Sequence, residues 1–259
     1  MKTTGVAVIG SGGIGTLRAH SCTQIPQVDY LAVCDTKQEK LGDLAAATNA
    51  NMRTSDYEEA IRDDRVGAVF VSTDEENHHG PAALAAELGK PVLIEKPFVL
   101  DLDEADDILA KAKASGSEVF VGYTQRFRRR YLLAKQAVQQ GQLGEIVMAM
   151  GKIYVTRAVG EAVASRSPNT TPSINTLTYL VDLILWYMEG KKPVEVYARA
   201  ASVVFKKYNR DDFQWMMVTF DDGSVATLGT SWLPPHHWPA YTATMEIDLH
   251  GATGALNID

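Results

Sequence analysis

The run VAVIGSGGIG at residues 6–15 points most directly to the fold. It begins with a continuous apolar segment of the kind that parallel sheets bury on both faces. The glycines Gly10, Gly12 and Gly15 then follow with the spacing G-x-G-x-x-G and lead into a helical pattern. In such a turn the first glycine permits a tight bend, the second lets the backbone approach a pyrophosphate, and the third lets helix and strand pack closely. The run therefore predicts the opening strand, turn and helix of a nucleotide-binding unit.

A carboxylate follows where such a unit needs one. Asp35 ends the second apolar run, about twenty residues beyond the glycines, where it can accept hydrogen bonds from an adenine ribose. It would repel a 2′-phosphate, and Thr36 follows it in place of an arginine, so NAD is the expected cofactor, while Lys37 leaves NADP open. A glycine-rich turn without a ligand is the alternative. The residues expected here at the cofactor are Gly10, Gly12, Gly13, Ile14, Gly15, Asp35 and Thr36.

The first half of the chain alternates apolar strands with helical patterns. The predicted strands are 6–10, 30–35, 66–72, 91–96 and 118–123, and the predicted helices are 13–24, 37–48, 56–63, 78–89 and 103–115. Repeated strand–helix units with right-handed crossovers build a doubly wound parallel sheet. Residues 1–123 are therefore expected to form an α/β domain of the Rossmann type that binds a dinucleotide.

The pattern changes after residue 123. A basic helix at 128–141 leads into a long strand, then a polar loop at 156–171 and an apolar helix at 170–190. The last part is predicted as strands at 194–205, 213–221, 224–232 and 242–250. Strands in direct succession favour antiparallel pairing, so residues 124–259 are expected to form an α+β domain with a largely antiparallel open sheet.

Composition narrows the class of protein. The chain has 259 residues, 46% of them hydrophobic, and a net charge of −7, which argues against a general binder of nucleic acid or anionic membranes. The basic run RFRRR at 126–130 is the local exception, and a solvated helix face is its ordinary interpretation. Cys22 and Cys34 lack metal-ligand spacing, so neither a disulfide framework nor a metal site is expected. With no secretory or membrane-spanning pattern, a cytoplasmic protein is predicted.

The helix at 170–190 carries a polar stripe. Thr171 is the expected N-cap with Pro172 in the first turn, and Gly190 followed by Pro193 ends the helix. The stripe consists of Asn175, Tyr179, Asp182 and Trp186, and the opposite side consists of Leu177, Leu180, Val181 and Ile184. The stripe either faces water or lines a site, and helical periodicity alone leaves both open.

The segment VLIEKPF at 92–98 adds a resemblance to a known family. Together with the glycine turn, Asp35, VGYTQRF at 121–127 and the helix at 170–190, it makes the chain similar to the Gfo/Idh/MocA oxidoreductases over its whole length. Members usually run considerably further, so the second domain is expected to be short at its C-terminal end. The resemblance also implies a homodimer or homotetramer that forms through the open sheet.

Lys96 is the candidate catalytic lysine. It closes a predicted buried strand at the crevice where open α/β sheets bind ligands, and there it can donate to a substrate hydroxyl or ketone oxygen. A structural pair with Glu95 is the alternative. The resemblance implies that Lys96 is catalytic, that Glu95 and Lys96 lie at the cofactor, and that the peptide before Pro97 is cis.

Further site residues rest on the same resemblance. Thr73 and His78 are expected near the nicotinamide ribose, although His78 could equally begin a surface helix together with His79. Arg126 and Tyr123 belong to the VGYTQRF segment and are expected to bind substrate.

In many members of the family this helix has the pattern D-x-x-x-H-x-x-D. Aligned on Asp182, this chain has Asn175 in place of the first Asp and Tyr179 in place of the His, so both positions depart from the commonest pattern. Some members similar to this chain, glucose–fructose oxidoreductase among them, carry tyrosine in place of the histidine. A phenol beside a lysine cation can pass the proton that accompanies hydride transfer. Asn175 cannot act as a base but can hydrogen-bond substrate hydroxyls, as can Asp182.

The resemblance thus predicts an NAD(P)-dependent oxidoreductase that transfers hydride to or from a secondary alcohol or ketone of a sugar or polyol. Lys96 and Tyr179 would be its catalytic pair. Two alternatives remain. One is a non-catalytic NAD(P)-binding regulatory or interaction protein, because a fold does not determine its function. The other is a dehydrogenase of non-sugar diols or semialdehydes.

Overall fold

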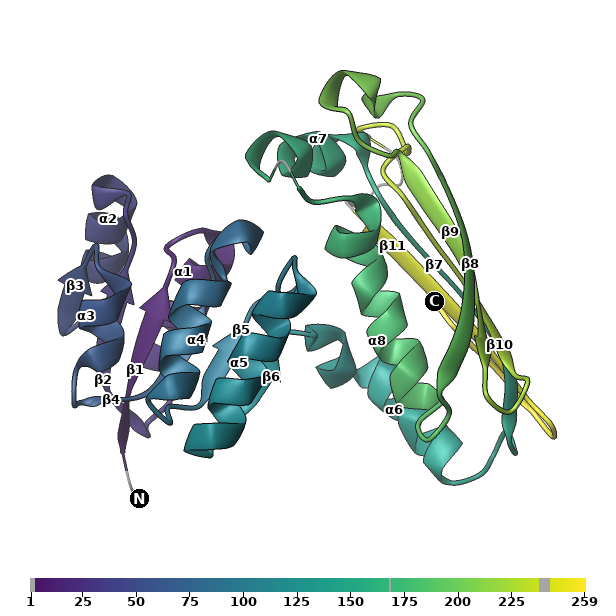
Figure 1. Cartoon of the computed structure of the whole chain (residues 1–259), viewed down its shortest axis with the longest axis horizontal. Coiled ribbons are helices and arrows are strands. Elements are labelled where there is room, and N and C mark those ends of the chain that lie inside the picture. The colour runs from purple at the N-terminus through teal and green to yellow at the C-terminus, as the bar shows by residue number, and fades with distance from the viewer. Residues whose placement is uncertain (1–2, 168, 238–242) are drawn as a thin grey trace. The chain divides into compact units, whose positions relative to one another are not determined.

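The structure, a computed structural model, describes residues 3–167, 169–237 and 243–259. The chain divides into two compact units, Met1–Gly122 (unit 1) and Tyr123–Asp259 (unit 2) (Figure 1).

Unit 1 is built on six parallel strands. They are β1 (Thr4–Ile9), β2 (Val28–Cys34), β3 (Met52–Thr54), β4 (Val66–Val71), β5 (Val92–Ile94) and β6 (Val119–Val121). Their order across the sheet is β3-β2-β1-β4-β5-β6, with parallel pairing throughout, so the predicted doubly wound sheet is confirmed. The three-residue strand β3 is an addition to the prediction.

Helices cover both faces of this sheet. They are α1 (Gly13–Thr23), α2 (Gln38–Thr48), α3 (Tyr57–Arg62), α4 (His79–Glu87) and α5 (Leu102–Ser115), with a short 3-10 turn, η1 (Glu75–Asn77). Because side chains alternate along a strand, Val6 and Val8 of β1 pack with α1 and α2, whereas Ala7 and Ile9 pack with α3, α4 and α5. This arrangement leaves the carboxyl ends of the strands and the loops that follow them to form a site.

Unit 2 contains a second six-stranded sheet. Its strands are β7 (Ile146–Val155), β8 (Pro193–Ala201), β9 (Phe213–Phe220), β10 (Val225–Ser231), β11 (Ala243–Gly251) and β12 (Ala255–Ile258), in the order β12-β11-β7-β10-β9-β8. Only the β7–β10 pair among them is parallel, which confirms the prediction of a largely antiparallel sheet. The strand predicted at 242–250 is β11, and its first predicted residue, Thr242, lies outside the described residues.

The helical elements of unit 2 are η2 (Thr124–Phe127), α6 (Arg129–Gln139), α7 (Arg157–Arg166), η3 (Ser173–Leu177), α8 (Thr178–Tyr187) and η4 (Phe205–Tyr208). Helices α6 and α8 lie against one face of the sheet (Figure 1). There Leu180 and Ile184 of α8 join Ala149 and Leu228 of the strands in one buried core. The opposite face of the sheet carries exposed side chains.

The loop predicted at 156–171 is wrong for most of its length. Residues 157–166 form α7, because Val163 packs into a small core with Phe205 and Trp232 that its own sequence could not reveal. Pro168 of that predicted loop lies outside the described residues.

The helix predicted at 170–190 is interrupted by a π-turn. Thr171 caps its start, since its Oγ1 accepts a hydrogen bond from the Ile174 N–H at 3.4 Å, as predicted. Within η3, however, the Thr178 N–H donates to the Ser173 carbonyl five residues back. Such a turn holds one extra residue and is frequent at functional sites. The extra residue shifts Asn175 relative to Tyr179, Asp182 and Trp186, so the stripe does not follow the regular helical spacing that the sequence predicted.

Candidate functional site

The glycine turn of unit 1 has the geometry that a nucleotide cradle needs. Gly10 has φ of 102°, and a Cβ there would lie 2.5 Å from the Ser72 carbonyl oxygen. A Cβ on Gly15 would lie 1.8 Å from the Gly10 oxygen, so helix and strand approach too closely for any side chain. A Cβ on Gly12 would meet nothing within 4 Å. The turn thus encloses open space beside the start of α1, where a pyrophosphate fits.

Asp35 is held in place beside this turn. Its Oδ2 accepts hydrogen bonds from the Ser11 N–H and Oγ–H, both at 2.7 Å, and its Oδ1 accepts one from the Lys37 N–H at 2.8 Å. Burial acts to raise the pKa of Asp35, but the hydrogen bonds from Lys37 and Ser11 outweigh it and lower the pKa below its usual value. The carboxylate is therefore ionised and oriented. Ser11 is a functional residue that sequence reasoning missed, because the G-x-G-x-x-G pattern leaves that position unspecified.

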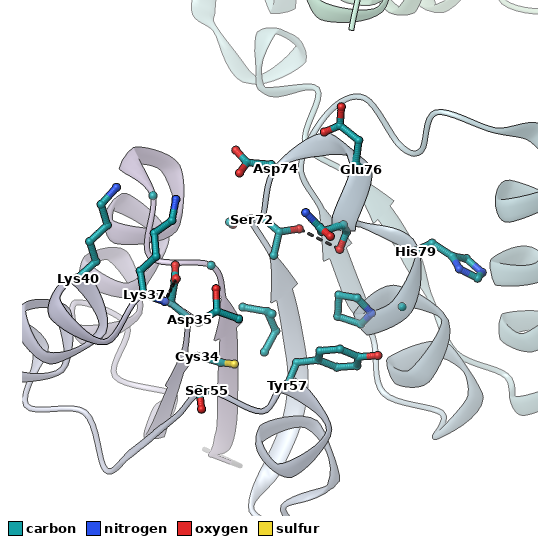
Figure 2. Close-up of a pocket in the computed structure, with 18 of the residues that line it drawn as sticks. Cys34, Asp35, Lys37, Lys40, Ser55, Tyr57, Ser72, Asp74, Glu76 and His79 are labelled. Carbon is teal, nitrogen blue, oxygen red and sulfur yellow. Dashed lines mark hydrogen bonds between the residues drawn. The ribbon is translucent and has the colours of Figure 1, made fainter. Parts of the chain in front are cut away.

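A cavity of about 520 Å³ joins the glycine turn to Asp35 (Figure 2). Among the predicted residues it is lined by Gly10, Gly12, Asp35, Thr36 and Thr73. Lys37 and Lys40 stand beside Asp35, whereas Asp74, Glu76 and His79 come from the other side of the cavity (Figure 2). Its volume falls in the range of pockets that hold cofactors and other small ligands. The chain's own residues therefore fit the adenosine and pyrophosphate parts of a dinucleotide. Gly13 and Ile14 are exposed at the start of α1.

Glu95 is paired with an arginine of α1. The Arg18 guanidinium donates two hydrogen bonds to Glu95 Oε1, at 3.0 and 2.6 Å, and the Glu95 side chain is only 12% exposed. Lys96 follows two residues beyond the end of β5 and is half-buried. The peptide between Lys96 and Pro97 is cis, as expected. The ion pair between Arg18 and Glu95 therefore links α1 to the residue that precedes Lys96.

His78 is buried rather than placed on a surface helix. It is 1% exposed, and its Nδ1 lies 2.9 Å from the Pro97 carbonyl oxygen and 3.2 Å from that of Phe98. Its Nε2 lies 3.3 Å from the Thr73 carbonyl oxygen, so both ring nitrogens face main-chain carbonyl oxygens. His78 thereby joins the segment after β4 to the segment that follows Lys96. The surface alternative is thus wrong for His78, whereas His79 does begin α4, with its Nε2 2.8 Å from an Asp107 carboxylate oxygen.

In unit 2, Asp182 of the stripe forms a charged pair with Arg126 of η2. The Arg126 guanidinium contacts both carboxylate oxygens of Asp182, with distances of 2.8 and 2.7 Å. The Asp182 side chain is 9% exposed. The Trp186 ring lies beneath two cations, Arg126 and Lys135, each 5.4 Å from its centroid. These residues therefore hold one another, and Arg126 is positioned by Asp182.

Tyr179 and Asn175 occupy different environments. Tyr179 is half-buried, and its ring meets that of Tyr123 edge-on with centroids 6.2 Å apart. Burial, followed by the charge of Asp182, raises the pKa of Tyr123. Asn175 is 5% exposed within the π-turn.

A cavity of about 310 Å³ adjoins this part of unit 2. Its lining is mostly apolar and includes Tyr123, Ile174, Val181, Leu185 and Met216, with Asp182 at one side. Sequence reasoning assigned Val181 only to the side opposite the stripe, whereas it borders both the core and this cavity.

Two further features bear on chemistry. Among the described residues, no group of three or more His, Cys, Asp or Glu side chains is arranged to hold a metal ion, and no helix has the length and apolar character to cross a membrane. Burial raises the pKa of Cys22 to about 11 and that of Cys34 to about 12, so both thiols stay protonated at neutral pH.

Comparison with known proteins places these features in a family. Residues 4–123 match the family described as "Oxidoreductase family, NAD-binding Rossmann fold", and residues 131–257 match the "GFO/IDH/MocA C-terminal domain". The chain is 24% identical to the uncharacterized oxidoreductase YrbE of Bacillus subtilis, over 97% of this chain and 72% of the relative. It is also 24% identical to myo-inositol 2-dehydrogenase of Thermotoga maritima, over 98% of this chain and 75% of the relative.

Solved structures agree in fold. The structure of scyllo-inositol dehydrogenase from Lactobacillus casei with NAD(H) and scyllo-inositol superposes with a TM-score of 0.88 at 21% identity, covering 99% of this chain and 76% of that one. The family resemblance, the fold class and the NAD-binding Rossmann domain predicted from the sequence are thus confirmed. The chain belongs to the Gfo/Idh/MocA family of oxidoreductases, and unit 1 is its NAD-binding domain.

Proposed function

We propose that this protein is an NAD-dependent dehydrogenase that acts on a secondary alcohol of a cyclic polyol or sugar. The observation that carries the cofactor choice is Asp35, whose carboxylate is fixed by Ser11 and Lys37 in the cavity beside the glycine turn. The polyol is supported by relatives named inositol dehydrogenases, which match 98% of this chain. NAD supplies the site that accepts or returns a hydride when it is bound.

Lys96 and Tyr179 are the proposed catalytic pair. In the oxidation direction, the Tyr179 Oη takes the proton of the substrate hydroxyl as hydride leaves the same carbon. Lys96 donates a hydrogen bond to that substrate oxygen, and its charge favours the phenolate form of Tyr179. In reduction, the same proton returns from Tyr179 to the substrate oxygen. The half-buried setting of Tyr179 against Tyr123 supports this role, since packing limits the directions that its ring can take.

The other predicted substrate residues receive more specific roles. Asn175 and Tyr123 are proposed to hydrogen-bond substrate hydroxyls, while Asp182 of α8 and Arg126 of η2 act mainly by holding each other in place. Among the cofactor residues, Thr36 and Thr73 line the cavity and are proposed as direct contacts. Glu95 and His78 are proposed as positioning residues, because each is bonded to a neighbouring segment of unit 1.

Turnover tests this proposal. Inositols, sugars, sugar acids and aromatic diols are screened with NAD and NADP by nicotinamide absorbance, and the best substrate is used for variants. Tyr179→Phe and Lys96→Met should each lower kcat by about 100-fold or more. The matched control Lys113→Met alters an exposed side chain of α5 and should keep the wild-type rate. Near-full turnover by both site variants would refute the catalytic pair.

We also propose that two copies associate through the open face of the second sheet. Met150 of β7, Met217 of β9 and Tyr197 of β8 share a cross-strand row on that face and are 41%, 48% and 60% exposed. The Trp215 ring lies in contact with Gly229 beside this row. Thr227 of β10 stands between the two methionines in this row, and exposed apolar side chains gathered on one face in this way favour an interaction surface.

Sedimentation velocity tests the association. Met217→Glu should convert an oligomer into a monomer, because a carboxylate at the centre of the patch would have to be buried unpaired. Leu102→Glu places the same charge on an exposed position of unit 1 and should leave the oligomer intact. A wild-type chain that sediments as a monomer at micromolar concentration would contradict the proposal.

A further inference from the structure

The edge strand β8 is exposed along almost its whole length. It ends the order of the second sheet, so on one side it pairs with no strand of the described part of the chain. Its first eight residues are all exposed, which includes the side chains on both faces. Val194, Val196 and Tyr197 are 63%, 58% and 60% exposed. A long edge with exposed apolar side chains is a template for pairing with another strand.

The usual protection of a sheet edge is confined to the start of β8. Such edges are commonly blocked by proline, by lysine or by a bulge. Pro193 and an irregular step in the register both precede Glu195. From Glu195 to Ala201 the pairing with β9 is regular, and the sequence contains neither proline nor lysine. The main-chain groups of this stretch that point away from β9 can therefore accept a second strand.

The two faces of β8 differ in chemistry. Val196 lies opposite Val218, which belongs to the core beneath α6 and α8, so Val196 points to that face of the sheet. Side chains alternate along a strand, so Glu195, Tyr197 and Arg199 point to the open face. There the tyrosine has a carboxylate on one side and a guanidinium on the other. One face of the edge is thus apolar, and the other carries two opposite charges.

This pattern is complementary to itself. Tyr197 is the middle residue of β8, which runs from Pro193 to Ala201. If two copies pair antiparallel about Tyr197, Glu195 of each lies opposite Arg199 of the other. A two-fold axis makes every such contact twice. An axis moved by one residue in either direction would place Tyr197 opposite one of the charged groups and would leave the other without its counterpart. Full overlap of the strands and matching of the charges therefore select the same register.

We propose that the β8 edges of two copies of this chain pair antiparallel about a two-fold axis at Tyr197, so that their second sheets join into one continuous sheet. This contact uses the edge of the sheet and is separate from association through its open face. The row that contains Met150, Met217 and Tyr197 would continue across the axis into the second copy. One strand pair buries less area than a standard interface, so the Kd should be on the order of 100 µM.

Sedimentation equilibrium tests the edge in a chain that carries Met150→Glu. This change blocks the open face from β7, three strands away from β8. The Met150→Glu chain should form a dimer between about 10 and 500 µM. Adding Glu195→Arg or Arg199→Glu puts like charges opposite each other at two positions and should raise the Kd about tenfold or more.

The combination of Glu195→Arg with Arg199→Glu exchanges the two charges and should restore the Kd to within about threefold, because opposite charges again face each other. The matched control is Glu118→Arg, which makes the same change in net charge at an exposed position of unit 1 and should leave the Kd unchanged. Amide hydrogen exchange identifies the surface, since main-chain N–H groups of β8 should gain protection in the dimer and lose it with Glu195→Arg.

The outcomes separate the two surfaces. The edge contact would be refuted by a Met150→Glu chain that stays monomeric at about 500 µM, by single reversals that leave the Kd unchanged, or by a charge exchange that restores nothing. A wild-type oligomer that Met150→Glu leaves intact and Glu195→Arg dissociates would contradict association through the open face while supporting the edge.

Discussion

The cofactor cavity of unit 1 and the helix at 172–187 of unit 2 both gather functional side chains, but by different physical means. In the cavity, main-chain geometry does most of the work, since Gly10 and Gly15 allow contacts that no side chain could tolerate and Asp35 is held largely by N–H groups. On the helix, side chains position one another, as Asp182 does for Arg126. A site built from backbone tolerates little change in sequence, whereas one built from side chains can be altered residue by residue to suit another substrate.

The largest effect is expected where backbone meets backbone. Gly15→Ala would place a Cβ 1.8 Å from the Gly10 oxygen, so the helix or strand must move, with a loss of about 3 kcal/mol in the free energy of unfolding. Gly13→Ala is the control two positions earlier, because its Cβ would meet nothing within 4 Å. Urea denaturation of the two variants measures the difference. Equal stabilities would mean that the turn is looser than its geometry indicates.

A smaller loss is expected from the charged pair of unit 2. Asp182→Asn leaves the Arg126 guanidinium without its carboxylate, and the cost should be about 2 to 3 kcal/mol, below that of a fully buried pair because Arg126 is 40% exposed. Glu246→Gln breaks the exposed pair with Lys152, where the two side chains are 44% and 41% exposed, and should cost less than about 1 kcal/mol. Thermal unfolding of both variants measures the contrast. Equal losses would show that burial does not separate the two pairs.

The same contrast explains what could be predicted from the sequence. The parallel sheet, the glycine turn and Asp35 were predictable, because each depends on neighbouring residues or on a spacing of fixed geometry. The partners Ser11 of Asp35 and Arg18 of Glu95 were not, since such contacts form only when the chain folds. The π-turn around Asn175 was also hidden, because a periodic pattern contains no sign of one inserted residue. Helix α7 was missed for a related reason, as Val163 depends on a core supplied by distant residues.

A more modest effect is expected from Asp35→Asn. The amide retains the shape but replaces one acceptor oxygen with a donor that faces the N–H groups of Ser11 and Lys37. Affinity for NAD should fall about tenfold, equivalent to roughly 1.4 kcal/mol, and the preference over NADP should narrow because the repelling charge is gone. Titration calorimetry with both nucleotides provides the measurement, and Asp43→Asn on the exposed face of α2 is the control. An unchanged ratio of the two affinities would remove Asp35 from cofactor selection.

The smallest effect concerns pH and again separates the two regions. Burial opposes ionisation of Asp35, but hydrogen bonds from Lys37 and Ser11 lower its pKa, so its ionised form is favoured in the folded state. The ionised Asp35 therefore contributes its full stabilisation at pH values above its pKa in the unfolded chain, which is about 3.9. That contribution is lost as the pH falls through its lower pKa in the folded protein. Affinity for NAD should therefore stay flat from about pH 8 to 5 and weaken only below about pH 4.

Tyr123 in unit 2 shifts in the opposite sense, since burial and then Asp182 raise its pKa and keep its phenol protonated above about pH 10. A change in turnover at alkaline pH below 10 would therefore come from the titration of a group other than Tyr123. Tyr179 is the proposed group, and Tyr179→Phe should remove the change. Calorimetry across pH 4 to 8 and rate profiles up to pH 10 separate the two regions. A loss of NAD affinity between pH 7 and 5 would mean that the hydrogen bonds to Asp35 do not outweigh its burial, and that this main-chain cradle is weaker than its distances imply.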